Sequence, residues 1–143
     1  RMTNPLPVFH FLVEWGGTRV GFTEVSGLEE EIGIIEYREG SSPSAAPQLI
    51  PGLRRAGGVV LRRGLLPRDN ELYDWFNTAG VGTVERRDIT VSLLNAEHEP
   101  TAVWRLANAW PAAISISDLD AAANAVAIES VEIVCDSVRR QMP

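Results

Sequence analysis

The side chains that most often perform catalysis or bind metals are few in this chain and poorly grouped. His10 and His98 are its two histidines, and neither has a second ligand at metal-binding spacing. Cys135, the single cysteine, alternates onto an apolar face, which favours a buried structural thiol over a nucleophile. A single cysteine also excludes an internal disulfide. These residues therefore predict neither a metal site nor a nucleophilic centre.

Two carboxylate pairs could resemble the paired acids of a hydrolase. Asp118 and Asp120 fall in a predicted turn, where aspartate is common for backbone reasons. Glu129 and Glu132 fall on opposite faces of a predicted strand. All 13 basic residues are arginine, which excludes chemistry that needs a lysine amine, such as Schiff-base formation. Since phosphate-loop, nucleophile-elbow and zinc patterns are also missing from the sequence, we expect a protein that is not an enzyme and needs no cofactor.

Charge is concentrated in two segments of opposite sign. Residues 24–39 hold six acids against one arginine, and residues 54–68 hold five arginines and no acid. These segments either neutralise each other within one subunit or meet on neighbouring copies, in head-to-tail contacts that close into rings or continue as filaments. The hypothesis of a contact between copies gives a candidate subunit or ring interface. Its members are Glu29, Glu30, Glu31, Glu36, Glu39, Leu49, Ile50, Leu53, Arg54, Arg55, Arg62 and Arg63.

Alternation of apolar and polar residues predicts the strands that position these side chains. The first strand covers 8–15, and Gly16-Gly17 can supply the positive φ angles of a tight turn before a second strand at 18–24. Further strand patterns lie at 28–38, 59–61, 87–94, 101–109, 114–116 and 125–136. Residues 39–53 follow neither period and predict a long loop, which is either a disordered tip or a segment that orders when rings stack. Residues 139–143 are predicted to form a loose tail.

One helix is predicted after residue 68. Asp69 is its expected N-cap and Gly80 its expected left-handed end. An apolar stripe at helical spacing consists of Leu72, Trp75, Phe76 and Ala79. Trp75, together with Trp15 and Trp104 on apolar strand faces, is predicted to pack in the core.

These elements predict a single domain over residues 1–143, with its core at about 5–138. The expected fold class is mainly β: an antiparallel β-barrel or sandwich of about seven or eight strands with one flanking α-helix. A closed or nearly closed barrel is the simplest arrangement, because one short helix cannot cover two sheet faces and closure hides the strand edges.

Composition narrows the environment and the partners. A net charge of −6 argues against a nucleic-acid coat, which needs basic residues to neutralise phosphates. The sequence shows no secretory leader and no apolar run near the ~20 residues of a membrane-spanning helix. We therefore expect a protein made in the cytoplasm without a signal peptide, whose monomer does not insert into a membrane.

Ordered blocks of the sequence resemble contractile phage tail-tube proteins. In chain order the blocks are FLVE at 11–14, GFTEVSGLE at 21–29, EYREG at 36–40, LRRG at 61–64, ELYDWF at 71–76, WRLANAWP at 104–111, and the segment 118–129. The resemblance implies an Hcp-like fold, related to the tube protein of type VI secretion. It also implies a structural subunit whose hexameric rings stack into a hollow inner tube, which a sheath drives through a target envelope.

Partners also follow from the resemblance. They are further copies of the chain, a sheath protein, baseplate and tube-initiator proteins, a tape-measure protein, a tail terminator, and DNA or effector protein as cargo in the lumen. The particle is a phage tail, a tailocin or an extracellular injection system, cytoplasmic until release or extracellular. Two alternatives remain: a type VI secretion-like ring protein that carries effectors, and a monomeric β-barrel enzyme or ligand carrier.

Overall fold

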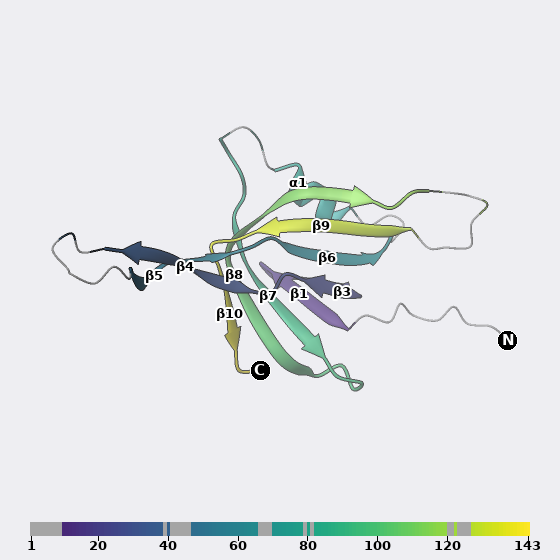
Figure 1. The fold of residues 1–143 in the computed structure, drawn as a ribbon. Helices are drawn as coiled ribbons and strands as arrows, with labels where there is room; N and C mark the ends of the chain where they lie inside the picture. The colour runs from purple at the N-terminus through teal and green to yellow at the C-terminus, as the bar shows by residue number, and fades with distance from the viewer. Residues whose placement is uncertain are drawn as a thin grey trace.

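The computed structural model describes residues 10–38, 40, 47–65, 70–78, 80, 82–119, 122 and 127–143. Ten strands and one helix lie in these ranges (Figure 1). They are β1 (Phe11–Trp15), β2 (Thr18–Phe22), β3 (Glu24–Ser26), β4 (Glu30–Tyr37), β5 (Gln48–Ala56), β6 (Val59–Gly64), α1 (Glu71–Phe76), β7 (Arg87–Leu94), β8 (Pro100–Ile116), β9 (Ile128–Val134) and β10 (Ser137–Gln141). The predicted fold class, mainly β with antiparallel strands and one helix, is confirmed.

Eight of the strands form one antiparallel sheet with the order β2-β1-β7-β8-β9-β6-β3, and β10 also pairs with β8. The sheet is not closed into a barrel by pairing of β2 with β3, so the prediction of closure is wrong in this respect. The two end strands are instead consecutive along the chain. Between them, the Thr23 amide donates a hydrogen bond of 2.9 Å to the Arg62 carbonyl oxygen. The backbone therefore passes directly from one sheet edge to the other.

Strand β8 connects the two halves of this sheet. Its first part pairs with β7 and β10, and its last part pairs with β9. Irregular geometry marks the transition: Asn108 has a φ of 50°, and the register with β9 shifts between Pro111 and Ala113. A shift of register bends and twists a strand, which lets one long strand serve both halves.

The core lies between the sheet faces and under α1. Its largest fully buried side chains include Phe22, Leu61, Leu106 and Ile133, and the helix contributes Leu72 and Trp75. The Trp15 and Trp75 rings stack with centroids 5.1 Å apart. The predicted core roles of these two tryptophans are confirmed, Trp104 packs partly buried against the core, and Cys135 is buried as predicted.

The helix differs from its predicted bounds. It begins after Asn70 and ends at Phe76, so the prediction of an end at Gly80 is wrong. The reason is a local hydrogen bond: the Thr78 hydroxyl donates to the Trp75 carbonyl oxygen at 2.7 Å and satisfies a terminal carbonyl. Gly80 forms an isolated bridge with Thr83. The predicted N-cap Asp69 lies outside the described residues.

Two segments predicted as irregular are strands. The predicted loop 39–53 is wrong from residue 48 onward, because β5 begins at Gln48 and pairs with β4. The predicted loose tail is wrong for 139–141, because β10 pairs with β8 and buries Val138. In both cases cross-strand pairing outweighs the weak local pattern. Residues 39 and 41–46 lie outside the described part of the chain, and the single domain stays a prediction.

Candidate assembly surface

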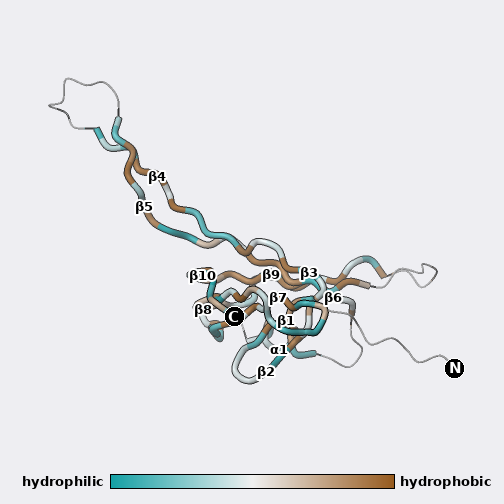
Figure 2. Tube along the Cα trace, turned by 90° about the horizontal axis from the view of Figure 1, so that it is seen from below, coloured by the Kyte–Doolittle hydropathy of each residue, from teal (hydrophilic) through white to brown (hydrophobic). Residues whose placement is uncertain are grey.

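Strands β4 and β5 form a separate two-stranded sheet, here called the arm, that projects far from the rest of the molecule (Figure 2). At its root, Ala56 packs against the core cluster. Further out, its apolar residues contact solvent on both faces. Seven large apolar side chains of the arm are 39% to 84% exposed, with Leu53 at the upper limit. A solvent-exposed ribbon of this composition needs a partner, since large exposed apolar patches mark interaction sites.

The register divides these side chains between two faces, because residues directly opposite each other in an antiparallel pair share a face. Face one carries Ile32, Ile34 and Leu49. Face two carries Ile35, Tyr37, Ile50 and Leu53. Antiparallel sheets with one solvated face show apolar residues on the other face only. The arm departs from that pattern, since both of its faces are apolar and exposed.

A β-bulge lies near the middle of the arm. The register shifts between Ile32 and Ile34, so that Gly33 faces both Gly52 and Leu53. A Cβ at Gly52 would lie 3.0 Å from the Gly33 carbonyl oxygen and 3.0 Å from the Ile35 side chain, so any larger residue would be crowded there. The contact with Ile35 places position 52 toward face two. Pro51 and Gly52, which weakened the strand pattern in the sequence, are thus accommodated at an irregular point of a two-stranded ribbon.

The arm also carries most of the charges that we predicted at an interface. Glu31 lies opposite Arg55, and Arg54 lies opposite Ile32. Within the part of the chain that the structure describes, Arg54 and Arg55 are exposed and form no ion pair. Glu36 is exposed near the outer end of the arm, and the predicted Glu39 lies outside the described residues. The structure therefore brings Glu31, Glu36, Leu49, Ile50, Leu53, Arg54 and Arg55 together on one projection.

Two other predicted interface arginines have partners within the same chain. Arg62 lies 3.5 Å from Glu24, and Arg63 forms a buried ion pair of 2.9 Å with Glu129. Arg63 is only 3% exposed, with its guanidinium carbon 5.6 Å from the centroid of the Phe22 ring. A surface role for Arg63 is therefore wrong. Strand alternation carries the signal that identifies it, because Arg63 shares a face with the buried residues Val59 and Leu61.

The root of the arm lies near Cys135. Burial is the main cause that raises the pKa of the Cys135 thiol, and the negative charges of Asp136 and Glu30 add to it. Glu29 is exposed just before β4, whereas Glu30 is half-buried. The Oε2 atom of Glu30 is buried without a hydrogen-bond partner in the described structure. This environment keeps the thiol neutral, as expected for a structural cysteine.

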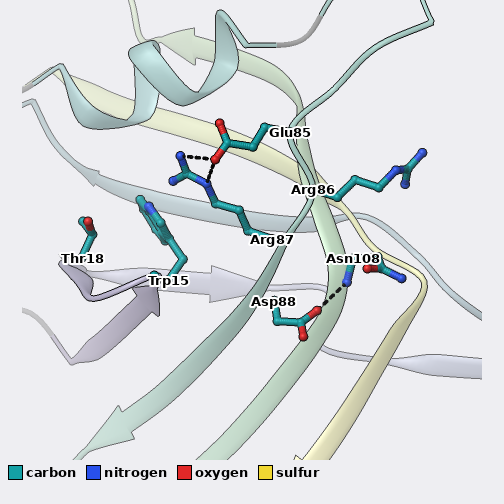
Figure 3. Close-up of a pocket in the computed structure, with 8 residues that line it drawn as sticks. Trp15, Thr18, Glu85, Arg86, Arg87, Asp88 and Asn108 are labelled. Carbon is teal, nitrogen blue, oxygen red and sulfur yellow. Dashed lines mark hydrogen bonds and ion pairs between the residues drawn. The ribbon is translucent and has the colours of Figure 1, made fainter.

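A separate cleft of about 580 Å³ lies beside the turn between β1 and β2 (Figure 3). Its lining residues are Trp15, Gly16, Thr18, Glu85, Arg86, Arg87, Asp88 and Asn108. Arg87 forms an ion pair of 2.9 Å with Glu85, and its guanidinium carbon lies 5.3 Å from the Trp75 ring centroid. The run of four charged residues at 85–88 is the sequence signal for this cleft, but we did not single it out.

The carboxylates of this cleft are already engaged. Asp88 accepts a hydrogen bond of 3.0 Å from the backbone amide of Asn108 and one of 3.1 Å from the Arg105 guanidinium. The bond from the Asn108 backbone amide is the larger cause that lowers the pKa of Asp88, and the bond from Arg105 lowers it further. The carboxylate therefore stays ionised and is poorly suited to general acid catalysis. Among the described residues, no group of three or more His, Cys, Asp or Glu side chains could hold a metal ion.

The described residues contain no helix with the length and apolar character required to cross a bilayer. The described residues form an antiparallel β body with a projecting, apolar two-stranded arm, which is an arrangement suited to self-association. The fold and the sequence together define the class as contractile tail tube proteins with an Hcp-like fold.

A family comparison assigns the chain within this class. The profile of the T4-like virus tail tube protein gp19 family matches residues 7–139, and the chain belongs to this family. No curated protein sequence gave a match. The predicted resemblance to contractile phage tail-tube proteins is thereby confirmed.

Solved structures agree with this assignment. The chain is 34% identical to a protein in the sheath-tube complex of an extracellular contractile injection system, PVC, in its extended state, over 97% of this chain and 93% of that one, with a TM-score of 0.82. It is 32% identical to a protein in the tube-terminating cap of the anti-feeding prophage, over 100% and 95% of the two chains, with a TM-score of 0.81. Hcp1 from Flavobacterium johnsoniae, at 14% identity over 94% and 97% of the two chains and a TM-score of 0.60, shares the fold.

Proposed function

We propose that this chain is the repeating subunit of the inner tube of an extracellular contractile injection particle, in which hexameric rings stack around an open lumen. Similarity over nearly the whole chain to proteins of a sheath-tube complex and of a tube-terminating cap supports this placement. The chain acts as a structural protein and not as an enzyme. The arm carries the contact between rings.

The exposed arm is the observation that carries the proposal. A two-stranded hairpin is marginally stable by itself in water. Here it also exposes seven large apolar side chains, which favours burial against another surface. In a homopolymer that surface belongs to another copy of the same chain, and a head-to-tail contact of this type continues from ring to ring.

The assembly gives the partners their places. The sheath surrounds the tube, baseplate and initiator proteins start it, a tape-measure protein sets its length, and a terminator closes it. Effector protein or DNA occupies the lumen. The subunit is made in the cytoplasm, and the finished particle acts outside the cell that made it.

A type VI secretion ring protein is the second candidate, and the comparisons favour it less. The structures of Hcp proteins and of a type six secretion system protein share 14% identity or less with this chain and have TM-scores of 0.60 or lower, against 34% and 0.82 for the injection-system protein. That alternative predicts isolated rings. The proposal instead predicts stacked tubes that lengthen as the protein concentration rises.

Deletion of the outer arm tests the proposed function. Replacing residues 34–51 with Asn-Gly joins Gly33 to Gly52 through a two-residue turn that hairpins favour. We expect wild-type protein to form tubes in negative-stain electron microscopy and the shortened protein to remain dispersed. Near-ultraviolet circular dichroism of the stacked Trp15 and Trp75 provides the control for folding. Tubes from the shortened protein, or no polymer from wild-type protein under any seeding condition, would contradict the proposal.

Charge reversal tests the predicted interface arginines separately. We expect Arg54→Glu with Arg55→Glu to raise the protein concentration needed for assembly. Arg19→Glu provides a matched control on β2, because Arg19 is also exposed and lies within 3.4 Å of Glu14 in the same chain. Assembly of the double variant at the wild-type concentration would remove these arginines from the interface.

A further inference from the structure

We propose that the solvent face of strands β10, β8 and β7 holds a binding site for the carboxylate groups of an acidic polypeptide segment, formed by Arg139, Arg105 and Thr90. The site goes beyond the proposed function, since it does not depend on a contact between rings. The observation behind it is a pair of arginines, Arg139 and Arg105, that lie directly opposite each other on neighbouring strands.

A row of polar side chains crosses five neighbouring strands on this face. Residues directly opposite each other in antiparallel strands share a face. In order across β10, β8, β7, β1 and β2, the members of the row are Arg139, Arg105, Thr90, Glu14 and Arg19. The residues next to them in the chain, among them Val138, Leu106, Val91 and Val13, are buried in the core. Because successive side chains alternate between faces, the row lies on the outer side of these strands, which Figure 1 shows side by side.

The charges of this row do not balance. Arg19 pairs with Glu14 at 3.4 Å, and Arg105 pairs with Asp88 at 3.1 Å, so these two carboxylates are engaged. Arg139 is exposed, and within the described ranges of the chain it forms no ion pair. Like charges directly opposite each other are destabilising, and here they occur in a chain whose net charge is −6. Proteins break such rules chiefly at functional sites, so the arrangement indicates a binding role.

The donors of the site suit a carboxylate. Side chains directly opposite each other have Cβ atoms about 5 Å apart, so two guanidinium groups can reach one ligand. Each guanidinium presents its N–H donors in a planar fork that matches the two oxygens of a carboxylate. Thr90, on the other side of Arg105, is half-buried and carries a hydroxyl that can donate a further hydrogen bond.

The small extent of the positive charge favours a polypeptide over a nucleic acid. A nucleic-acid surface must neutralise many phosphates, whereas Arg139 is the one member of this row whose charge is not paired within the described residues. Glu14 follows Thr90 in the row and would repel a continuous polyanion. Separate carboxylates with neutral residues between them avoid this repulsion.

Peptide binding to the full-length protein tests the site. The probe is a short fluorescent peptide of alternating glutamate and glycine residues, and fluorescence anisotropy at low salt measures its affinity. We expect Arg139→Gln to weaken binding by about 10- to 100-fold, the factor for loss of hydrogen bonds to a charged group. The same peptide with glutamine in place of glutamate should not bind.

Arg140→Gln provides the matched control. It removes the same charge from the next residue, whose side chain lies on the opposite face with its guanidinium carbon 6.0 Å from the Trp104 ring centroid. We expect this variant to bind the peptide like wild-type protein. Equal affinities of Arg139→Gln and Arg140→Gln, or no binding of the peptide by wild-type protein, would overturn the proposal.

Two further measurements separate the site from simpler explanations. Because Arg139 opposes Arg105, Arg139→Gln should melt at the wild-type temperature or above it when no peptide is present. A lower melting temperature would show a structural role for Arg139 and contradict the proposal. Inorganic phosphate should displace the peptide only in large excess. Displacement at equal concentration would show a general oxyanion site and overturn its assignment to a polypeptide.

Discussion

Adjacent residues of the same type can have opposite roles when they lie on a strand. Arg62 and Arg63 are neighbours in β6, yet Arg62 is partly exposed beside Glu24, and Arg63 is buried with Glu129. The buried pair links β6 to β9, which are adjacent in the sheet. Removing ions from water is unfavourable, so the pair is tolerated because each ion compensates the other.

Loss of one partner of this pair should destabilise the subunit strongly. We expect Glu129→Ala to lower the free energy of unfolding by about 3–5 kcal/mol, because it removes the buried carboxylate that lies 2.9 Å from the Arg63 guanidinium. Urea denaturation followed by tryptophan fluorescence measures the change. The double variant Arg63→Met with Glu129→Leu should recover most of the stability. If Glu129→Ala were as stable as wild-type protein, the pair would have no structural role.

The Cys135 thiol should be unreactive in the folded protein. Burial and nearby carboxylates raise its pKa, so the reactive thiolate is scarce at neutral pH. We expect a thiol reagent to label Cys135 at pH 7 only after addition of denaturant. The raised pKa also has a consequence for stability. The neutral thiol is favoured by the fold, so its contribution is complete below the ordinary thiol pKa of about 8.5 and declines as the pH rises above it.

A comparison with Cys135→Ala isolates the pH effect. The wild-type melting temperature should fall more steeply above about pH 8.5 than that of Cys135→Ala, which has no thiol to ionise. Differential scanning fluorimetry across the pH range measures both proteins. Parallel curves, or rapid labelling without denaturant, would show that the thiol is accessible.

At the scale of elements, β10 adds a strand that pairs with β8, although its sequence carries no clear strand pattern. Val138 is buried, and the strand pairs with β8 from Ser137↔Ala107 to Gln141↔Val103. A strand at the end of a chain is ordered only when pairing and burial hold it. The C-terminal segment is therefore part of the sheet up to Gln141.

Truncation distinguishes the strand from the residues after it. Deletion of residues 137–143 removes the β10 ladder and the buried Val138, so we expect a loss of at least ~2 kcal/mol in stability or failure to fold. Deletion of residues 142–143 alone should have no measurable effect, since Met142 is exposed. Thermal unfolding of the two truncated proteins tests this prediction. Equal stability of both would mean that β10 contributes nothing.

Much of the fold was predictable where one face of a strand meets the core. The alternation in β1 and the glycines at 16 and 17 predicted the first hairpin. The structure agrees with this prediction, since Gly16 and Gly17 have φ angles of 53° and 88°. Strand β5 could not be identified in this way. Its nine residues include Pro51 and Gly52 and point apolar side chains to both faces, so no period-two pattern marks it.

The candidate surface was predictable in part for the same reason. The charges of the arm and three of its exposed apolar residues, Leu49, Ile50 and Leu53, were named from the sequence as interface candidates. The four apolar residues of β4 were not, and the position of all of them on a projecting ribbon follows from pairing between β4 and β5. The successive isoleucines at positions 34 and 35 were the available sequence signal for this surface. Successive residues point to opposite faces of a strand, and apolar residues on both faces are typical of strands that are buried on both sides. To predict that Arg63 lies in the core, one must know that it shares a face of β6 with Val59 and Leu61, because side chains alternate between the two faces of a strand.

At the scale of the whole molecule, folding stability and assembly should be linked. If the arm is buried by other copies, association stabilises the folded state by mass action. We expect the melting temperature of wild-type protein to rise with protein concentration. The protein in which Asn-Gly replaces residues 34–51 should melt at one temperature at all concentrations. A wild-type melting temperature that does not depend on concentration, in samples that contain tubes, would contradict this link.

If the arm carries the contact between rings, as proposed, it also gives the polymer a direction. Because every subunit carries one projecting ribbon, a stack of identical rings has bare ribbons at one end and empty receiving surfaces at the other. The two ends therefore differ in chemistry, and growth at one end is not equivalent to growth at the other. A factor that starts the stack and a factor that stops it must accordingly have different shapes: one provides receptors and the other provides ribbons or plugs.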